Sequence, residues 1–287
     1  MDSPRPSKRR RVSGSKGTSG SASGLVTPIS PSNELKSSKT STKDSSSKNI
    51  LTKALDVLRV EAEALSNIHK IYATDTLARQ GLFSAVSAVL NAQKLGGKLV
   101  VCGVGKSAYI AQKLVATAKS LGIPASFMHA CEAAHGDLGD LRSQDVLLFV
   151  SFSGKTPELL NLLPHISPKI KLMAMSSQRR KEDCLLLQGA DDGVLLPAPI
   201  HESEESTFGV KAPTTSTTVA LAVADMLILT VADEMHRDKT HEVFTKNHPG
   251  GAIGLDHREV EKLREAEVDV SVLELPPSPE ASGGDEY

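Results

Sequence analysis

The sequence predicts an α/β fold, a three-layer α-β-α sandwich built on a five-stranded parallel sheet. Two features of the chain indicate this. Short apolar segments alternate with longer segments whose apolar residues recur every three or four positions, which is the pattern of strands alternating with amphipathic helices. One apolar segment, 145–152, shows no polar alternation, as expected of a strand covered on both faces. In such a fold, ligands bind at the carboxyl ends of the strands.

The first two expected helices cover 49–72 and 76–93. Apolar residues of the first recur along one face, at Leu51, Leu55, Leu58, Ala62, Leu65 and Ile68. The second ends at a Gly-Gly pair, a common helix stop. Beyond it, strands are expected at 98–103, 124–130, 145–152, 169–177 and 192–197. The intervening and final helices are expected at 107–121, 156–166, 180–190 and 214–236.

One domain is expected at 49–260, between a basic tail at 1–48 and a short tail at 261–287. Residues 1–48 contain fifteen serines, ten Lys or Arg and three acidic residues. Such a segment cannot bury enough apolar surface to offset the entropy of ordering, so it is expected to be disordered. It carries a net charge of +7, which leaves −8 on the rest of the chain. The domain itself is therefore not expected to bind nucleic acid directly.

Composition also bears on location. We find no apolar run of about eighteen residues and so expect no membrane span. Three cysteines fit a reducing, intracellular compartment such as the cytoplasm. The basic run in the tail is either a nuclear localisation signal or a solvated segment with no address. It consists of Lys8, Arg9, Arg10 and Arg11.

The stretch VVCGVGKSAYIAQKL contains Gly105-Lys106-Ser107 and admits three interpretations. An ATP-type P-loop needs a glycine five positions before Gly105, where the chain has Val100. A dinucleotide-binding loop needs an acidic residue about twenty positions further on, and the segment LGIPAS found there has none. The third interpretation, that Lys106 serves another kind of phosphate chemistry, is therefore favoured.

Hydroxyl side chains gather before or at the starts of three expected helices. They are Ser107, Ser151, Ser153, Thr156 and Thr214. Serine and threonine cap helices routinely, so a single loop of this kind would indicate little. Their recurrence favours a ligand that carries a phosphate, because amides at helix starts and hydroxyl groups both donate hydrogen bonds to anions.

Five segments resemble sugar isomerase (SIS) domains in their order and spacing. They are VCGVGKSAYIAQKL, HACEAAHGDLG, LLFVSFSGKTPELL, APTTSTTVALAVADML and NHPGGAIG, and the resemblance covers about residues 55–254. Within this family, the chain looks most like the arabinose-5-phosphate isomerases. The resemblance implies a homodimer or homotetramer that interconverts arabinose 5-phosphate and ribulose 5-phosphate, or a related pentose phosphate, without a cofactor.

The resemblance also implies four catalytic residues. They are Lys106, Glu158, Glu205 and His248. Aldose–ketose isomerisation moves a proton between adjacent carbons, so it needs an acid–base group and a positive charge near the developing oxyanion. Lys106 would supply the charge, Glu158 would carry the proton, and His248 would open the sugar ring or donate a proton to oxygen. Spacing from APTT selects Glu205, and a difference of one residue would select Glu204 instead.

Each of these residues has a simpler alternative, as a solvated or helix-capping side chain. The five hydroxyl residues are expected to bind the phosphate, and Gly105, His135 and Asp137 to line the sugar pocket. The segment HACEAAH also contains His129, Cys131, Glu132 and His135, of which two or three could hold zinc, but it offers no clear fourth ligand. No metal is therefore expected.

The chain departs from the SIS isomerases at several points. Lys155 follows Gly154 where these proteins usually have glutamate, and Ala108-Tyr109 stands in place of Gly-His. The chain ends about thirty residues after Gly254, which is too short for the CBS modules that many of these isomerases carry. These departures keep an alternative open, a non-catalytic regulatory protein that binds a sugar phosphate.

Overall fold

The computed structural model describes residues 40–249, with side chains from residue 47 onward. The chain divides into two units, Met1–Asn49 and Ile50–Tyr287, and the second contains the sheet and the helices around it. The basic run Lys8–Arg11, the tail at 261–287 and most of the NHPGGAIG segment lie outside the described residues. The expectations placed on them stay expectations.

Five parallel strands form the central sheet, in agreement with the sequence. They are β1 (Leu99–Gly103), β2 (Ala125–His129), β3 (Val146–Val150), β4 (Lys171–Ser176) and β5 (Val194–Pro197). Their order across the sheet is β2-β1-β3-β4-β5, and every neighbouring pair is parallel. All five carboxyl ends therefore meet at one edge, which we call the carboxyl edge.

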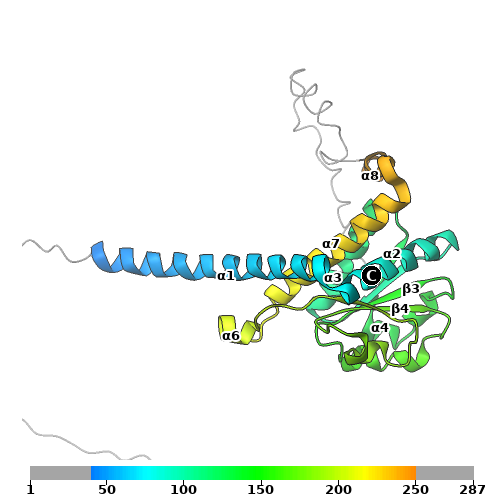
Figure 1. Ribbon diagram of the computed structural model, residues 1–287, viewed down its shortest axis with the longest axis horizontal. Helices are drawn as coiled ribbons and strands as arrows, with labels where there is room; N and C mark the ends of the chain where they lie inside the picture. The colour runs from blue at the N-terminus through cyan, green and yellow to red at the C-terminus, as the bar shows by residue number, and fades with distance from the viewer. Residues whose placement is uncertain (1–39, 250–287) are drawn as a thin grey trace, which may run out of the picture. The chain divides into compact units, whose positions relative to one another are not determined.

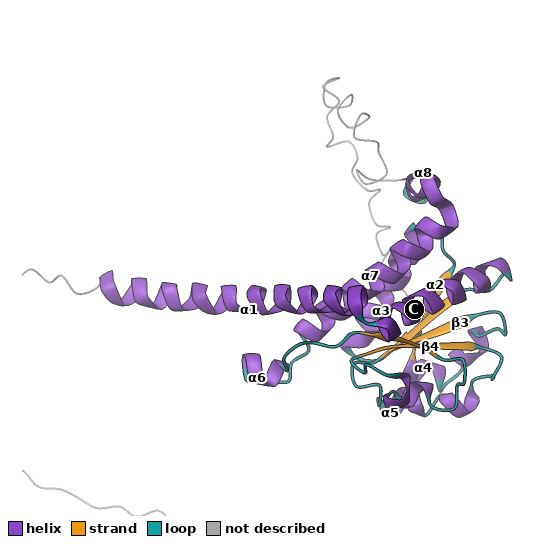
Figure 2. Cartoon of the chain, viewed as in Figure 1, coloured by secondary structure: helices purple, strands orange, loops and turns teal. Residues whose placement is uncertain are grey.

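Long helices cover one face of the sheet and short ones the other, and the first long helix takes part only from Val60 onward, where its buried residues begin (Figures 1 and 2). The long helices are α1 (Thr40–Thr74), α2 (Thr76–Lys94), α3 (Lys106–Ser120) and α7 (Thr215–His236). The short ones are α4 (Ala130–Ala133) and α5 (Pro157–Leu160), together with four 3₁₀ turns at Asp137–Asp140, Leu163–His165, Lys181–Asp183 and Leu185–Leu187. The chain also forms α6 (Glu204–Phe208), a 3₁₀ turn at Arg237–Lys239 and α8 (Thr240–Lys246).

Successive residues of a strand point to opposite faces, and the two cores follow this alternation. Val101 packs with the long helices, whereas Val100 and Cys102 pack with the short ones. The residues that β1 contributes to the two cores are fully buried. This explains why the strand segments contain no polar alternation, and it confirms the predicted three-layer sandwich.

The predicted helix at 180–190 is wrong, because the structure has two 3₁₀ turns there. Cys184, Leu186 and Leu187 are all buried against the face of the sheet that the short helices cover. An α-helix presents only one face to a neighbour, so it could not bury this dense apolar set. The helix predicted at 156–166 is also broken. It ends at Leu160. Pro164, which has no N–H group to donate a hydrogen bond, lies in the turn that follows.

One helix contradicts the expectation that no segment is apolar enough to cross a membrane. The continuous stretch Thr215–Lys246 passes that test by length and composition, and half of its most apolar window is buried inside the fold. Val219, Leu227 and Ile228 of α7 are fully buried among the other long helices. This packing is that of a core helix.

Candidate functional site

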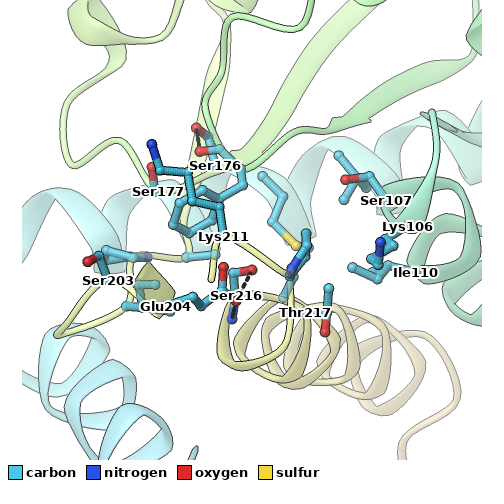
Figure 3. Close-up of a pocket in the computed structure, with 18 of the residues that line it drawn as sticks. Lys106, Ser107, Ile110, Ser176, Ser177, Ser203, Glu204, Lys211, Ser216 and Thr217 are labelled. Atoms are coloured by element: carbon cyan, nitrogen blue, oxygen red, sulfur yellow. Dashed lines mark hydrogen bonds between the residues drawn. The ribbon is translucent and has the colours of Figure 1, made fainter. Parts of the chain in front are cut away.

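A cavity of about 770 Å³ opens at the carboxyl edge of the sheet. It is lined by the residues that follow β1, β3, β4 and β5 and by the first turns of α7 (Figure 3). This is the position at which parallel α/β sheets bind ligands, and the volume lies within the usual range for small-molecule sites. The sequence-based expectation of a site at this edge therefore corresponds to a real cavity.

Lys106 and Ser107 form one wall of the cavity, at the start of α3. The helix can begin this close to β1 because residue 103 is glycine. A Cβ there would lie 2.9 Å from the carbonyl carbon of Ser107. Lys106 is exposed, and its ammonium makes no hydrogen bond or ion pair with any residue of the described range. It is therefore a cation available to an anionic ligand.

The hydroxyl groups of the serine loop after β3 bind within the loop. The hydroxyls of Ser151 and Thr156 are 2.7 Å apart, and the amide of Gly154 donates to Ser151 Oγ at 3.2 Å. The amide of Lys155 likewise donates to Ser153 Oγ at 3.1 Å. These three hydroxyl residues do not line the cavity, which touches the loop through Phe152. The predicted phosphate contacts of this loop stay a prediction.

Sequence reasoning missed several hydroxyl residues of the cavity wall, among them the pair Ser176 and Ser177. Ser176 ends β4 and Ser177 follows it. The hydroxyl of Ser176 donates to the carbonyl of Phe152 at 3.0 Å, and the amide of Ser177 donates to the same carbonyl at 2.8 Å. The predicted strand 169–177 ended in this serine pair, so the reasoning applied to the other strand ends would have found it.

Glu204 is the first residue of α6, and its carboxylate reaches the N-terminus of α7 on the floor of the cavity (Figure 3). Its Oε1 accepts hydrogen bonds from the amide of Thr214 at 2.6 Å, the amide of Ser216 at 3.0 Å and the hydroxyl of Ser216 at 2.8 Å. A carboxylate is favoured there by the free amides and the helix dipole. The amide of Thr214, predicted to bind phosphate, is therefore already occupied by a side chain of the same protein.

Glu205 also lines the cavity, but its surroundings differ from those of Glu204. Its carboxylate forms an ion pair with Lys211, 3.2 Å from nitrogen to oxygen, in which the side chains are 60% and 78% exposed. Exposed pairs of this kind are weak. The carboxylate of Glu205 is therefore free to exchange partners, whereas that of Glu204 is held.

The four predicted catalytic residues divide into two groups. Lys106 and Glu205 share the cavity, and Glu158, exposed in the first turn of α5, lies at the same edge of the sheet without lining it. His248 lies elsewhere in the chain. Its ring nitrogens are 3.2 Å from Ser120 Oγ and 2.8 Å from the carbonyl of Phe244. Since Ser120 ends α3 and Lys106 begins it, His248 sits at the opposite edge of the sheet within one chain.

The remaining predicted residues lie around the cavity rather than in it. Gly105, with φ +55°, precedes α3 in a backbone conformation that favours glycine. His135 and Asp137 are exposed in the loop after β2. None of these three lines the cavity. Their roles stay predictions.

Metal and thiol chemistry have little support in the described residues. Within 40–249, no group of three or more His, Cys, Asp or Glu side chains could hold a metal ion, and the zinc arrangement considered for HACEAAH is not formed. Cys131 is exposed, whereas Cys102 is buried. Burial raises the pKa of the Cys102 thiol to about 12, so this thiol stays protonated.

Comparison with known proteins shows which family the chain resembles. Residues 96–230 match the family model described as SIS domain. Arabinose 5-phosphate isomerase KdsD of Yersinia pestis is 38% identical over 199 residues, which cover 69% of this chain and 55% of the relative. The chain spans about half the length of the curated relatives it matches.

Solved structures agree over nearly their whole length. A Bacteroides fragilis protein assigned as a phosphosugar isomerase involved in capsule formation is 33% identical, with a TM-score of 0.58, and the match covers 70% of this chain and 98% of that one. A protein of Escherichia coli CFT073, solved in complex with arabinose 5-phosphate, is 29% identical with a TM-score of 0.55. That match covers 67% of this chain and 96% of the other.

Proposed function

Since the chain belongs to the SIS domain family, we propose that it is a sugar-phosphate isomerase that interconverts the aldose and ketose forms of a phosphorylated sugar. Arabinose 5-phosphate and ribulose 5-phosphate are the first candidate pair, since relatives are arabinose 5-phosphate isomerases. The observation that carries the proposal is the shared cavity of Lys106 and Glu205. It combines a free cation with an exchangeable carboxylate at the carboxyl edge of the sheet.

The chemistry assigned to these residues follows from the reaction. A base removes a proton from the carbon beside the carbonyl and returns it to the neighbouring carbon, through an enediolate. Glu205 is the cavity carboxylate that could carry this proton, a role typically worth ~10²–10⁴-fold in rate. Lys106 would stabilise the negative charge that develops on oxygen, an effect of roughly 10²–10³-fold for a single donor.

The start of α3 is our proposed position for the phosphate. No side chain caps this helix, so its first amides and the positive end of its dipole face the cavity beside Lys106 and Ser107. The start of α7 is a poorer choice, because the carboxylate of Glu204 already fills it. The hydroxyls of the serine loop would join the phosphate only after exchanging their present internal partners.

Glu158 and His248 stay part of this proposal, Glu158 as a second carboxylate for proton transfer beside Glu205 and His248 in opening the sugar ring. Glu158 lies at the same edge of the sheet without lining the cavity, so it would reach the substrate only if the short α5 moved. His248 could act only from a second copy of the chain, so its role depends on the predicted homodimer or homotetramer. Exposed leucines on α1 fit such an assembly. They are Leu51, Leu55 and Leu58, with exposures of 58%, 54% and 64%.

The test is an isomerase assay of the full chain against a panel of pentose and hexose phosphates, with calorimetric binding measured in parallel. We expect turnover of at least one aldose–ketose pair, and its loss in Lys106→Met and Glu205→Gln. Binding without turnover would instead select the regulatory, sugar-phosphate-binding alternative. An absence of both binding and turnover across the panel would reject the proposal and its alternative together.

A further inference from the structure

Residues 201–211, which we call the wall segment, form one side of the cavity without being part of the buried core. The segment contains α6 and ends at Lys211. None of its residues is buried. Five of them, His201 to Glu205, and also Lys211, line the cavity. In Figure 3, Lys211 and Ser203 lie across the cavity from Lys106 and Ser107.

Few polar contacts join the wall segment to the rest of the described chain. Its own hydrogen bonds, such as Thr207 to Ser203 and Gly209 to Glu205, run within it. Among the residues with described side chains, two links leave it. One is an ion pair between His201 and Glu63, 3.7 Å apart and partly exposed. The other is the carboxylate of Glu204, which receives the hydrogen bonds of Thr214 and Ser216.

We propose that Glu204 is a positioning residue, which holds the wall segment in place so that its neighbour Glu205 can act on the substrate. The inference rests on the proposed function, and it assigns different roles to two adjacent glutamates. Glu204 Oε1 accepts from three close donors at the start of α7. Glu205 has only the exposed contact with Lys211 among the described side chains, and its carboxylate is the one left to accept and release a proton.

The two roles make opposite demands on the side chain. A positioning residue needs an acceptor oxygen of the right reach, which glutamine also provides. An acid–base residue needs a carboxyl group that can be protonated and deprotonated, which glutamine does not provide. The conservative change to glutamine should therefore preserve the function of Glu204 and destroy that of Glu205. Alanine at either position removes both properties.

Trypsin offers a direct measure of how firmly the wall segment is held. Lys211 is the only Lys or Arg between Lys181 and Arg237, so cleavage in this segment yields one identifiable pair of fragments. Cleavage requires local opening of the chain around the bond. We expect Glu204→Ala to be cut at Lys211 about tenfold faster than the unmodified chain, the change given by losing a typical helix cap. Glu204→Gln and Glu205→Gln should be cut at the unmodified rate.

Kinetics supply the second measurement, on whichever sugar phosphate the panel identifies. Glu204→Gln should keep kcat within about threefold of the unmodified enzyme. Glu204→Ala should raise KM, because a loosened wall binds substrate less well, while retaining part of kcat. Glu205→Gln should lower kcat by ~10² or more, with KM little changed.

The outcomes separate this inference from the proposed function. If no form of the protein turns over any sugar phosphate, the proposed function fails, and the tryptic rates still decide whether Glu204 holds the segment. Loss of kcat in Glu204→Gln as severe as in Glu205→Gln would show that Glu204 is itself the acid–base group and would overturn the inference. Cleavage of Glu204→Ala at the unmodified rate would also overturn it. If Glu204→Ala does not fold, Ser216→Ala, which removes one donor from Glu204, replaces it in the proteolysis test.

Discussion

Glu204 accepts two hydrogen bonds from Ser216, one from its amide at 3.0 Å and one from its hydroxyl at 2.8 Å. The two residues are twelve positions apart, and their contact closes the chain around the floor of the cavity. The adjacent Glu205 has no comparable contact with α7 among the described residues. The structure therefore gives different surroundings to two adjacent glutamates, between which the sequence chose only by spacing.

The first prediction concerns stability. Replacing Glu204 by alanine leaves the first amides of α7 without their acceptor and should lower the free energy of unfolding by about 1–2 kcal/mol. Glu205→Ala loses only an exposed ion pair and should cost less than about 0.5 kcal/mol. Urea unfolding of the two variants measures this difference. Equal losses would show that the capping contact contributes nothing in solution.

The second prediction concerns Lys106. Since its ammonium has no partner in the described chain, Lys106→Met should leave the unfolding free energy nearly unchanged while lowering kcat/KM by roughly 10²–10³-fold. Lys119→Met is the matched control, since Lys119 is exposed at the other end of the same helix, far from the cavity. Steady-state kinetics and thermal melts of both variants provide the measurement. Comparable activity in the two variants would remove Lys106 from the mechanism.

The third prediction is a pH dependence centred on Asp145, which lies at the edge of the sheet opposite the cavity and is 3% exposed. Its carboxylate accepts hydrogen bonds from the amide and the ammonium of Lys98, at 2.9 and 2.8 Å, and from the amide of Arg142 at 2.9 Å. Burial opposes ionisation of this carboxyl, but the hydrogen bonds outweigh burial and hold its pKa below the ordinary value of 3.8.

A lowered pKa in the folded state stabilises the fold above the ordinary pKa and loses that effect as pH falls through the folded value. Asp145→Asn should therefore lower the unfolding free energy by about 1.5–3 kcal/mol at pH 7, because it loses the charged hydrogen bond to Lys98, which keeps its contacts with Asp140. The difference between the two proteins should shrink below about pH 4. Urea unfolding at pH 7, 5 and 3 tests this, and a difference that stays constant with pH would contradict the assignment.

The fourth prediction concerns Gly81, in the middle of α2. Alanine normally stabilises a helix relative to glycine by roughly 1 kcal/mol. Here a Cβ would lie 2.2 Å from the carbonyl oxygen of Leu195 in β5. The helix could accommodate this atom only by moving away from the sheet. Gly81→Ala should therefore destabilise the protein, by about 1–3 kcal/mol. A rise in melting temperature would show that α2 packs less closely on β5.

Much of the fold could be predicted because it depends on local patterns. The apolar strands, the amphipathic helices and the parallel direction of the strands were all predicted from patterns along the chain. The edge of the sheet that holds the cavity was predicted in the same way. The failures lie where packing outweighs local preference. At 180–190, burial of Cys184, Leu186 and Leu187 beneath the sheet overrides a sequence that otherwise favours a helix.

The order of residues along the chain was enough to predict the layers of this protein, the family resemblance, and the positions of Lys106 and Ser107 at a strand's carboxyl end. Three further features emerged from the folded molecule alone: Glu204 caps α7, the hydroxyls of the serine loop bond within the loop, and His248 lies at the far edge of the sheet within one chain. They could not be predicted because helix and strand periodicity depends on residues that are close in the sequence. A hydrogen bond between distant segments depends instead on where the fold places two side chains, to within about an ångström. Two adjacent glutamates differ by one position in the sequence but meet entirely different partners in space.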